Sequence, residues 1–166
     1  MPRWPRFLVY RRRRTARVPT VAYRAHKETA RALLTERVLF YAPLVGVAPG
    51  RIAIRDTRRS WGSCSSKGNL NFNYKLLFLP ACWRDYIVVH ELCHLHHLNH
   101  SAAFWAEVER IMPDYRERAA ALRVFERTQG TSVQILSRAF VGHACARCVV
   151  TLEHNRTAVF VPPEGK

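Results

Sequence analysis

The chain has 166 residues, of which 48% are hydrophobic and 23% are charged. This length predicts one domain of catalytic size with room for a small appendage, and the composition excludes a fibrous, collagen-like or wholly disordered protein. Lys and Arg together number 27 against 12 Asp and Glu, which gives a formal net charge of +15. Such a charge attracts polyanions, so nucleic acid and nucleotides are candidate partners through non-specific binding to a basic surface.

The sequence predicts neither a membrane span nor a secretory signal. The longest uncharged stretch, residues 38–50, contains Pro43 and Pro49 and is too short and too interrupted to cross a bilayer. Residues 7–10 are the sole apolar run before the first arginine cluster, which is shorter than a signal peptide requires. We therefore expect a cytoplasmic protein. Its five cysteines, an odd number, are interpreted as thiols or ligands rather than as a disulfide framework.

The first elements are predicted from hydrophobic periodicity and turn residues. Residues 1–18 form a basic arm that contains no acidic residue, and we interpret it as a solvated tail rather than a dedicated nucleic-acid arm. Residues 51–55 alternate as in a half-buried strand, and residues 60–64 and 69–74 predict a β-hairpin about a Gly-containing turn. Residues 21 to about 44 predict a helix, because apolar residues recur every three to four positions. These residues are Ala30, Leu33, Leu34, Val38 and Tyr41.

Three further helices follow the hairpin. Pro80 is suited to open the first of them, which we expect to extend over residues 81 to about 98. Ser101 is a good N-cap for a helix over residues 102–112. The next helix begins at an Asp and Glu that form a capping box, and it is expected to span residues 114 to about 127.

These elements predict an α+β protein with three segments. The basic arm covers residues 1–18, and the folded domain covers residues 19–128. Residues 129–166 form a C-terminal extension, because the pattern loosens from residue 131 onward and does not predict a structure.

The expected chemistry lies on the helix after Pro80. His90-Glu91-Leu92-Cys93-His94 is an H-E-x-x-H pattern. On a helix, positions i and i+4 share a face, so two imidazoles can reach one metal ion. Glu91 is turned away from that face and can contact a metal-bound water without being a ligand itself.

A third imidazole completes the candidate metal site. His100 follows His94 by six positions, and Asn99 can adopt a left-handed turn that directs the chain back toward the metal. The pattern H-E-x-x-H-x5-H offers three neutral nitrogen ligands and one open position, as in catalytic zinc sites. The alternative is that these residues are ordinary core or surface histidines. Three histidines also accept several divalent ions, and we expect His96 and His97 to support or flank the site rather than bind the ion.

Taken together, these motifs and the hairpin resemble the YgjP-like metallopeptidase family, which is related to SprT-type proteases of the zincin group. The resemblance covers residues 21 to about 123. It rests on residues 59–64, residues 69–73, residues 85–94, residues 99–101 and Phe104-Trp105. It implies a zincin-like fold in which a small, mainly antiparallel sheet packs on the active-site helix. It also implies one zinc ion per chain, held by His90, His94 and His100, with Glu91 as general base.

Two segments depart from the family pattern. The β-rich N-terminal stretch of longer members is reduced here to the arginine arm. Near the other end, Cys145 and Cys148 resemble one knuckle of the zinc ribbon of SprT proteins, and His143 and His154 could complete a second metal site. A lone C-x-x-C pair is more often two ordinary thiols.

The hairpin suggests how a peptide could bind. A strand edge beside the metal can pair with an extended peptide, and Gly62 permits close approach of a backbone, although it could equally be a bulge. Asn71 and Asn73 could line the cleft as substrate-binding residues or form the wet face of an edge strand. Trp61 is interpreted as a core anchor, and Tyr74 and Tyr115 are candidates to stabilise an oxyanion.

Three functions remain open on this basis. The favoured one is a zinc-dependent metallopeptidase that acts on peptide or protein substrates. A nucleoside triphosphate pyrophosphohydrolase could use the same centre with Arg55, Arg58 and Arg59 on the phosphates, although the sequence has no Gly-rich phosphate loop. A DNA-associated protein or protease could use the basic surface, whose affinity would be non-specific and salt-sensitive.

Overall fold

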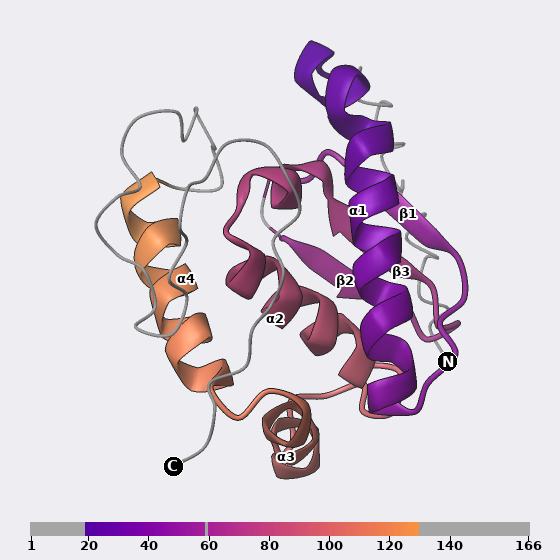
Figure 1. The fold of residues 1–166 in the computed structure, drawn as a ribbon, viewed down its shortest axis with the longest axis vertical. Helices are drawn as coiled ribbons and strands as arrows, with labels where there is room; N and C mark the ends of the chain where they lie inside the picture. Colours follow the sequence, from indigo (N-terminus) through magenta and orange to yellow (C-terminus); the bar gives the residue numbers. More distant parts are fainter. Residues whose placement is uncertain (1–18, 59, 130–166) are drawn as a thin grey trace, which may run out of the picture.

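The computed structural model describes residues 19–58 and 60–129. This part of the chain is α+β, as predicted, and its arrangement is drawn in Figure 1. The elements in chain order are α1 (Val21–Val45), β1 (Ile52–Arg55), β2 (Gly62–Cys64), β3 (Leu70–Asn73), the 3₁₀ helix η1 (Tyr74–Phe78), α2 (Ala81–Cys93), α3 (Ala102–Ile111) and α4 (Tyr115–Gln129). In the described ranges, no helix combines the length and apolarity that a bilayer crossing needs.

Local signals set both ends of α1. The hydroxyl of Thr20 accepts a hydrogen bond from the backbone N–H of Tyr23 at 3.1 Å, which caps the first turn. Gly46 ends the helix in the left-handed conformation, with φ of 86°. The buried face follows the predicted periodicity. It consists of Ala30, Leu34, Val38, Ala42 and Val45.

The sheet is mixed, which corrects the prediction of a mainly antiparallel one. Its strand order is β1-β3-β2. The hairpin prediction is confirmed, because β2 and β3 pair antiparallel, but β1 pairs with β3 in parallel. The chain leaves β1, reverses into β2 at the far edge and reverses again into β3. The last strand therefore fills the middle position in the same direction as β1. Leu70 and Phe72, 0% and 1% exposed, anchor this central strand in the core.

Helix α2 lies at the centre of the fold. It contacts α1, β2, α3 and α4, and Figure 1 shows it between α1 and α4 with α3 near its C-terminal end. The helix ends at Cys93, five positions short of the predicted end at about residue 98. The chain continues in tight turns, in which the N–H of Leu95 donates to the carbonyl of Leu92 and the N–H of His96 donates to that of Cys93. This early end lets the following residues curl back over the helix instead of extending it.

Polar contacts cap α3 and join α4 to α2. The hydroxyl of Ser101 accepts from the N–H of Phe104 at 3.4 Å, so the predicted N-cap of α3 is confirmed. Arg118 in α4 bonds Asp114 through two nitrogens and donates to the carbonyl of Cys82 at the start of α2. These bonds fix α4 against α2.

A charged pair joins α1 to α2. The Nε and Nη2 atoms of Arg37 each lie 2.8 Å from a different carboxylate oxygen of Asp85. The hydroxyl of Tyr41 donates to the same carboxylate at 3.2 Å. The side chains of Arg37 and Asp85 are 24% and 12% exposed, so solvent screens the pair only in part. Two-point pairing of this kind fixes the relative position of two helices as well as stabilising them.

The Asp85→Ala variant tests this link. We expect it to lower the free energy of unfolding by about 2 kcal/mol, because it leaves a partly buried guanidinium without its carboxylate. Urea denaturation measures the change. The matched control is Glu28→Ala, which removes a carboxylate that is 72% exposed and should cost less than about 0.5 kcal/mol. Equal effects of the two substitutions would contradict the anchoring role of Asp85.

Candidate metal centre

Three histidines from one helix, its end and the loop that follows meet at one point. His90 lies in the last turn of α2, His94 caps that helix, and His100 directly precedes the N-cap of α3. One ligand nitrogen from each ring lies within 4.8 Å of the others, and the Nε2 atoms of His90 and His100 are 3.0 Å apart. The predicted ligand set is therefore brought together, although His94 caps α2 rather than lying inside it.

Burial favours the neutral form of two of these imidazoles, His90 and His94. Burial lowers the pKa of His90 to about 3, and the charges that His94 and His100 would carry act in the same direction. Burial also lowers the pKa of His94. A metal ligand must be an unprotonated imidazole, so the lowered pKa values of His90 and His94 favour binding. Three nitrogen donors within this span fit a divalent ion such as zinc.

Aromatic side chains of α3 pack against the three histidines. Phe104 is fully buried, and its ring centroid lies 5.0, 4.6 and 4.8 Å from those of His90, His94 and His100. Trp105 stacks on His100 at 5.5 Å and on Tyr115 at 5.5 Å. The orientation of all three imidazoles therefore depends on how α3 packs against α2.

The turn after α2 orients His94. Its Nδ1 atom lies 2.9 Å from the carbonyl oxygen of His97. A carbonyl only accepts, so this bond assigns the proton to Nδ1 and leaves Nε2 free for a metal ion. Metal-binding histidines commonly use such an outer partner to fix their tautomer and ring direction.

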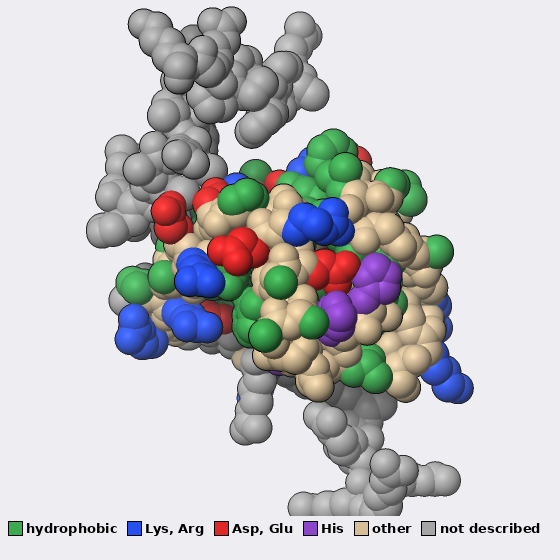
Figure 2. Space-filling model, turned by 90° about the horizontal axis from the view of Figure 1, so that it is seen from below, with side chains coloured by type: hydrophobic (Ala, Val, Ile, Leu, Met, Phe, Trp, Pro, Cys, Tyr) green, Lys and Arg blue, Asp and Glu red, His purple; other side chains and the backbone are tan. Residues whose placement is uncertain are grey.

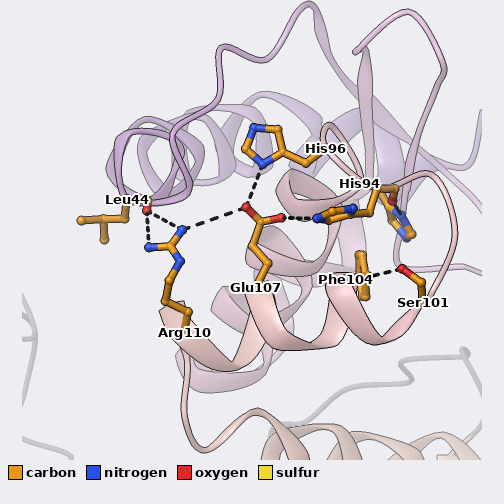
Figure 3. Close-up of polar contacts among 8 residues, drawn as sticks. Leu44, His94, His96, Ser101, Phe104, Glu107 and Arg110 are labelled. Carbon is orange, nitrogen blue, oxygen red and sulfur yellow. Dashed lines mark hydrogen bonds and ion pairs between the residues drawn. The ribbon is translucent and has the colours of Figure 1, made fainter.

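The carboxylate of Glu107 in α3 contacts histidine side chains of the turn that follows α2, as Figure 3 shows. Its Oε1 atom accepts from Nδ1 of His96 at 2.7 Å, and its Oε2 atom lies 3.5 Å from Nε2 of His97. Arg110 lies 4.0 Å from the same carboxylate and donates to the carbonyl of Leu44 in α1. Sequence reasoning missed Glu107. The available signal was an acidic residue three positions after Phe104, next to the apolar face of the helix.

Glu91 is buried against the hairpin. It is 7% exposed, and burial raises the pKa of its carboxyl to about 8. A Cβ atom on residue 62 would lie 2.6 Å from both Cγ and Oε1 of Glu91. Gly62 was predicted to permit close approach of a backbone or to form a bulge, and the structure places the Glu91 side chain beside it, so a Cβ atom there would force the carboxylate to shift.

An open cleft of about 340 Å³ exposes these groups. One wall is β2, which lies at an edge of the sheet. The cleft is lined by Gly62, Ser63, Cys64, His90, Glu91, His94, Leu98 and His100. Burial raises the pKa of the Cys64 thiol, and the charge of Glu91 adds to this shift.

Several other predicted residues lie away from the cleft lining. Asn73 is 1% exposed, and its amide donates to Thr57 and to the carbonyl of Ser60 at 2.9 to 3.2 Å. Its hydrogen bonds therefore fix the conformation of the loop before β2. Asn71 donates to the hydroxyl of Ser63 at 3.3 Å and accepts from Arg55.

The two tyrosines considered for oxyanion binding are also packed elsewhere. Tyr74 is 6% exposed and packs edge-on against Tyr23 and Phe78. The ring of Tyr115 stacks on Trp105. Trp61, at 6% exposure, is the core anchor that was predicted. The remaining candidates lie outside the described residues. They are Arg59, His143, Cys145, Cys148 and His154.

Comparison with known proteins identifies the family. The family model for the YgjP-like metallopeptidase domain matches residues 6–125. The chain belongs to the YgjP-like metallopeptidase family. This match includes the three histidines and Glu91, and it begins within the basic arm. No curated protein matches the sequence significantly.

A solved structure resembles this YgjP-like chain. It is the crystal structure of the metallopeptidase zymogen of Pyrococcus abyssi abylysin. The two chains are 28% identical, with a TM-score of 0.50, and the similarity covers 58% of this chain and 95% of abylysin. The family and this neighbour together establish a metal-dependent peptidase domain.

The Glu107→Leu variant tests whether this carboxylate supports the metal site. We expect the affinity for a divalent ion to fall about 10- to 100-fold, because the turn that orients His94 loses its outer partner. Competition with a chromophoric chelator measures the affinity. Glu109→Leu is the matched control on the same helix, since the Glu109 side chain is 51% exposed and pairs with Arg116. An unchanged affinity in Glu107→Leu would rule out the supporting role.

Proposed function

We propose that this chain is a zinc-dependent metallopeptidase of zincin-like fold, with Glu91 as its general base and acid. One observation carries the proposal. Three imidazoles have ligand nitrogens within 4.8 Å of one another, and the buried carboxyl of Glu91 adjoins them in the same open cleft. The donor chemistry fits zinc, which favours nitrogen ligands and keeps an open position in catalytic sites.

Glu91 is the group that moves protons in this scheme. A zinc ion held by His90, His94 and His100 would supply Lewis acidity, which polarises a carbonyl and lowers the pKa of water to about 7. Glu91 takes a proton as water attacks the carbonyl carbon of the peptide. As the carbon–nitrogen bond breaks, the same carboxyl gives that proton to the leaving nitrogen. Its burial supports this dual role, because burial raises the pKa of this carboxyl above its ordinary value, toward the range in which a group can both take and give a proton.

The wall of the cleft supports an extended peptide as the substrate. Strand β2 pairs with β3 on one side and is an edge of the sheet on the other. An edge strand offers backbone groups with which an extended peptide can pair. A peptide aligned with Gly62, Ser63 and Cys64 would pass beside the histidines and Glu91, because all of these residues line one cleft.

The charge of the lining favours a peptide over a nucleotide. Among the described residues, no Lys or Arg lines the cleft, whereas a triphosphate group calls for several cationic partners. Arg55 donates to Asn71 at 3.4 Å instead. Basic and acidic side chains are also interspersed among the described residues on the face seen in Figure 2, so that face does not support a nucleic-acid site. A cytoplasmic location and a second metal site at Cys145 and Cys148 remain predictions.

Metal analysis and peptide cleavage test the proposal together. Elemental analysis of the purified protein should give about one zinc ion per chain, and His100→Ala should lose most of it. A second equivalent that persists in His100→Ala would indicate the cysteine pair. Cleavage of casein-type substrates should be compared with pyrophosphate release from nucleotides. Because the similar abylysin chain is described as a zymogen, cleavage should be measured before and after limited proteolysis.

The Glu91→Gln variant isolates the proton-transfer role. We expect zinc content to stay the same and peptide hydrolysis to fall by about 10² to 10⁴, because an amide cannot accept the proton of the attacking water. Glu109→Gln provides the same chemical change at an exposed site. Full activity in Glu91→Gln would remove Glu91 from the mechanism.

The Gly62→Ala variant tests the contact between the hairpin and Glu91. The added Cβ would overlap with the Glu91 side chain, so we expect activity to fall at least about 10-fold while zinc is retained. The double variant Gly62→Ala, Glu91→Gln should be no less active than Glu91→Gln alone, because both changes act through one carboxylate. Additive losses would indicate that Gly62 acts by another route.

A further inference from the structure

The outer face of α1 carries an apolar patch near the C-terminal end of the helix. The described residues include seven large hydrophobic side chains that are exposed, and three of these lie within six positions of α1. Leu39, Phe40 and Leu44 are 66%, 56% and 50% exposed, and Pro43 is exposed as well. At about 100° per residue, these four positions share one face of the helix. We name them the α1 patch.

The contiguity of these side chains distinguishes them from ordinary exposed hydrophobic residues. Single apolar side chains are common on protein surfaces, whereas contiguous ones mark contact with a partner. The face that α1 buries against the fold is a separate one and includes Val38 and Ala42. In Figure 3 the side chain of Leu44 points away from Glu107 and His96. The α1 patch is therefore directed outward from the fold.

The ring of Phe40 is held in place before any partner binds. The guanidinium of Arg37 lies over it, 5.0 Å from the ring centroid, and the ring of Tyr41 contacts it edge-on at 4.9 Å. Arg37 is fixed in turn by its two bonds to Asp85. A side chain that is already ordered loses little conformational entropy when a partner covers it. Phe40 is therefore suited to the centre of an interface.

Opposite charges flank the α1 patch along the helix axis. Glu36 lies one turn before Phe40 and has no ion-pair partner among the described residues, although its charge acts on Arg84. Arg110 of α3 lies at the other end, where it donates to the carbonyl of Leu44 at 3.3 Å. Its side chain is 57% exposed, and a guanidinium has further N–H groups to donate. The patch is thus acidic at one end and basic at the other.

This polarity makes the α1 patch complementary to itself. Two antiparallel α1 helices that meet at Phe40 place Glu36 of one copy opposite Leu44 of the other, since both residues lie four positions from Phe40. The carboxylate then faces the Arg110 guanidinium that bonds the carbonyl of that leucine. Two-fold symmetry forms this charge pair twice, with the apolar side chains between the two pairs. A parallel arrangement would instead bring like charges together.

We propose that this chain forms a two-fold symmetric dimer in which the α1 patch of one copy packs antiparallel on that of a second copy. The inference does not depend on the proposed peptidase function. Apolar burial stabilises the dimer, and the reciprocal contacts of Glu36 with Arg110 fix its direction. One helix face gives a modest contact area, so the dimer dissociates on dilution.

Sedimentation velocity of the full chain tests the dimer. The measurement needs about 0.15 M salt, because two copies with a formal charge of +15 repel each other more strongly at low salt. We expect the wild type to change from monomer to dimer between about 1 and 100 µM, as for a modest interface. Leu44→Glu should raise the dissociation constant at least about 10-fold, because it buries a charge in the apolar contact.

The matched control is Val21→Glu on the same helix. Val21 is 74% exposed but lies outside the α1 patch, so the dissociation constant should not change. Thermal unfolding at the lowest concentration shows whether each variant is folded. A wild-type chain that stays monomeric, or a dimer that Leu44→Glu does not weaken, would overturn the proposal. Protection of Phe40 from a carbene label in such a monomer would identify another segment of the same chain as the occupant.

Exchange of the flanking charges tests the orientation. Glu36→Arg and Arg110→Glu should each raise the dissociation constant about 3- to 10-fold, because each places like charges opposite one another. The double variant restores opposite charges, so its dissociation constant should return toward the wild-type value. Additive losses in the double variant would overturn the antiparallel arrangement.

Discussion

Packing of one phenylalanine ring against three imidazoles holds the candidate active site together. Phe104 contacts His90, His94 and His100, and it belongs to α3, whereas the first two histidines belong to α2 and its cap. The position of α3 therefore decides whether the ligand nitrogens converge. Trp105 and Glu107 act from the same helix, the first by stacking on His100 and the second by holding the turn after His94. The candidate metal centre is thus formed at the α2–α3 interface.

Burial shifts the pKa values of side chains at this interface. Helix α2 lies at the centre of the fold, and most side chains of its last turns are buried, although a cleft opens beside His90, Glu91 and His94. Partial burial lowers the pKa of His90 and raises that of Glu91, because burial penalises the charged form of each group. The same environment therefore prepares neutral ligands and a carboxyl that can carry a proton. Gly62 permits this arrangement, since a Cβ atom at this position would overlap with the Glu91 side chain and force it to shift.

The strong positive charge of the chain is separate from this chemistry. The formal net charge is +15, yet the described lining of the cleft contains neither Lys nor Arg. Several basic residues of the described part are instead engaged in structural contacts, such as Arg37 with Asp85 and Arg118 with Asp114. The edge position of β2 and the lack of Lys and Arg in the described lining of the cleft both support the proposed peptide substrate.

The sequence by itself determined the features that depend on neighbours along the chain. The periodicity of α1, the Ser101 cap and the hairpin were predicted because spacing and turn residues act locally, and the i, i+4 spacing of His90 and His94 predicted a candidate ligand pair for the same reason. Only the tertiary structure decided the parallel pairing of β1 with β3, the end of α2 at Cys93, the contact of Gly62 with Glu91 and the roles of Asn73 and Glu107. Each of these depends on elements that are distant in sequence, so no local pattern encodes them; they follow from which surfaces the folded chain buries together.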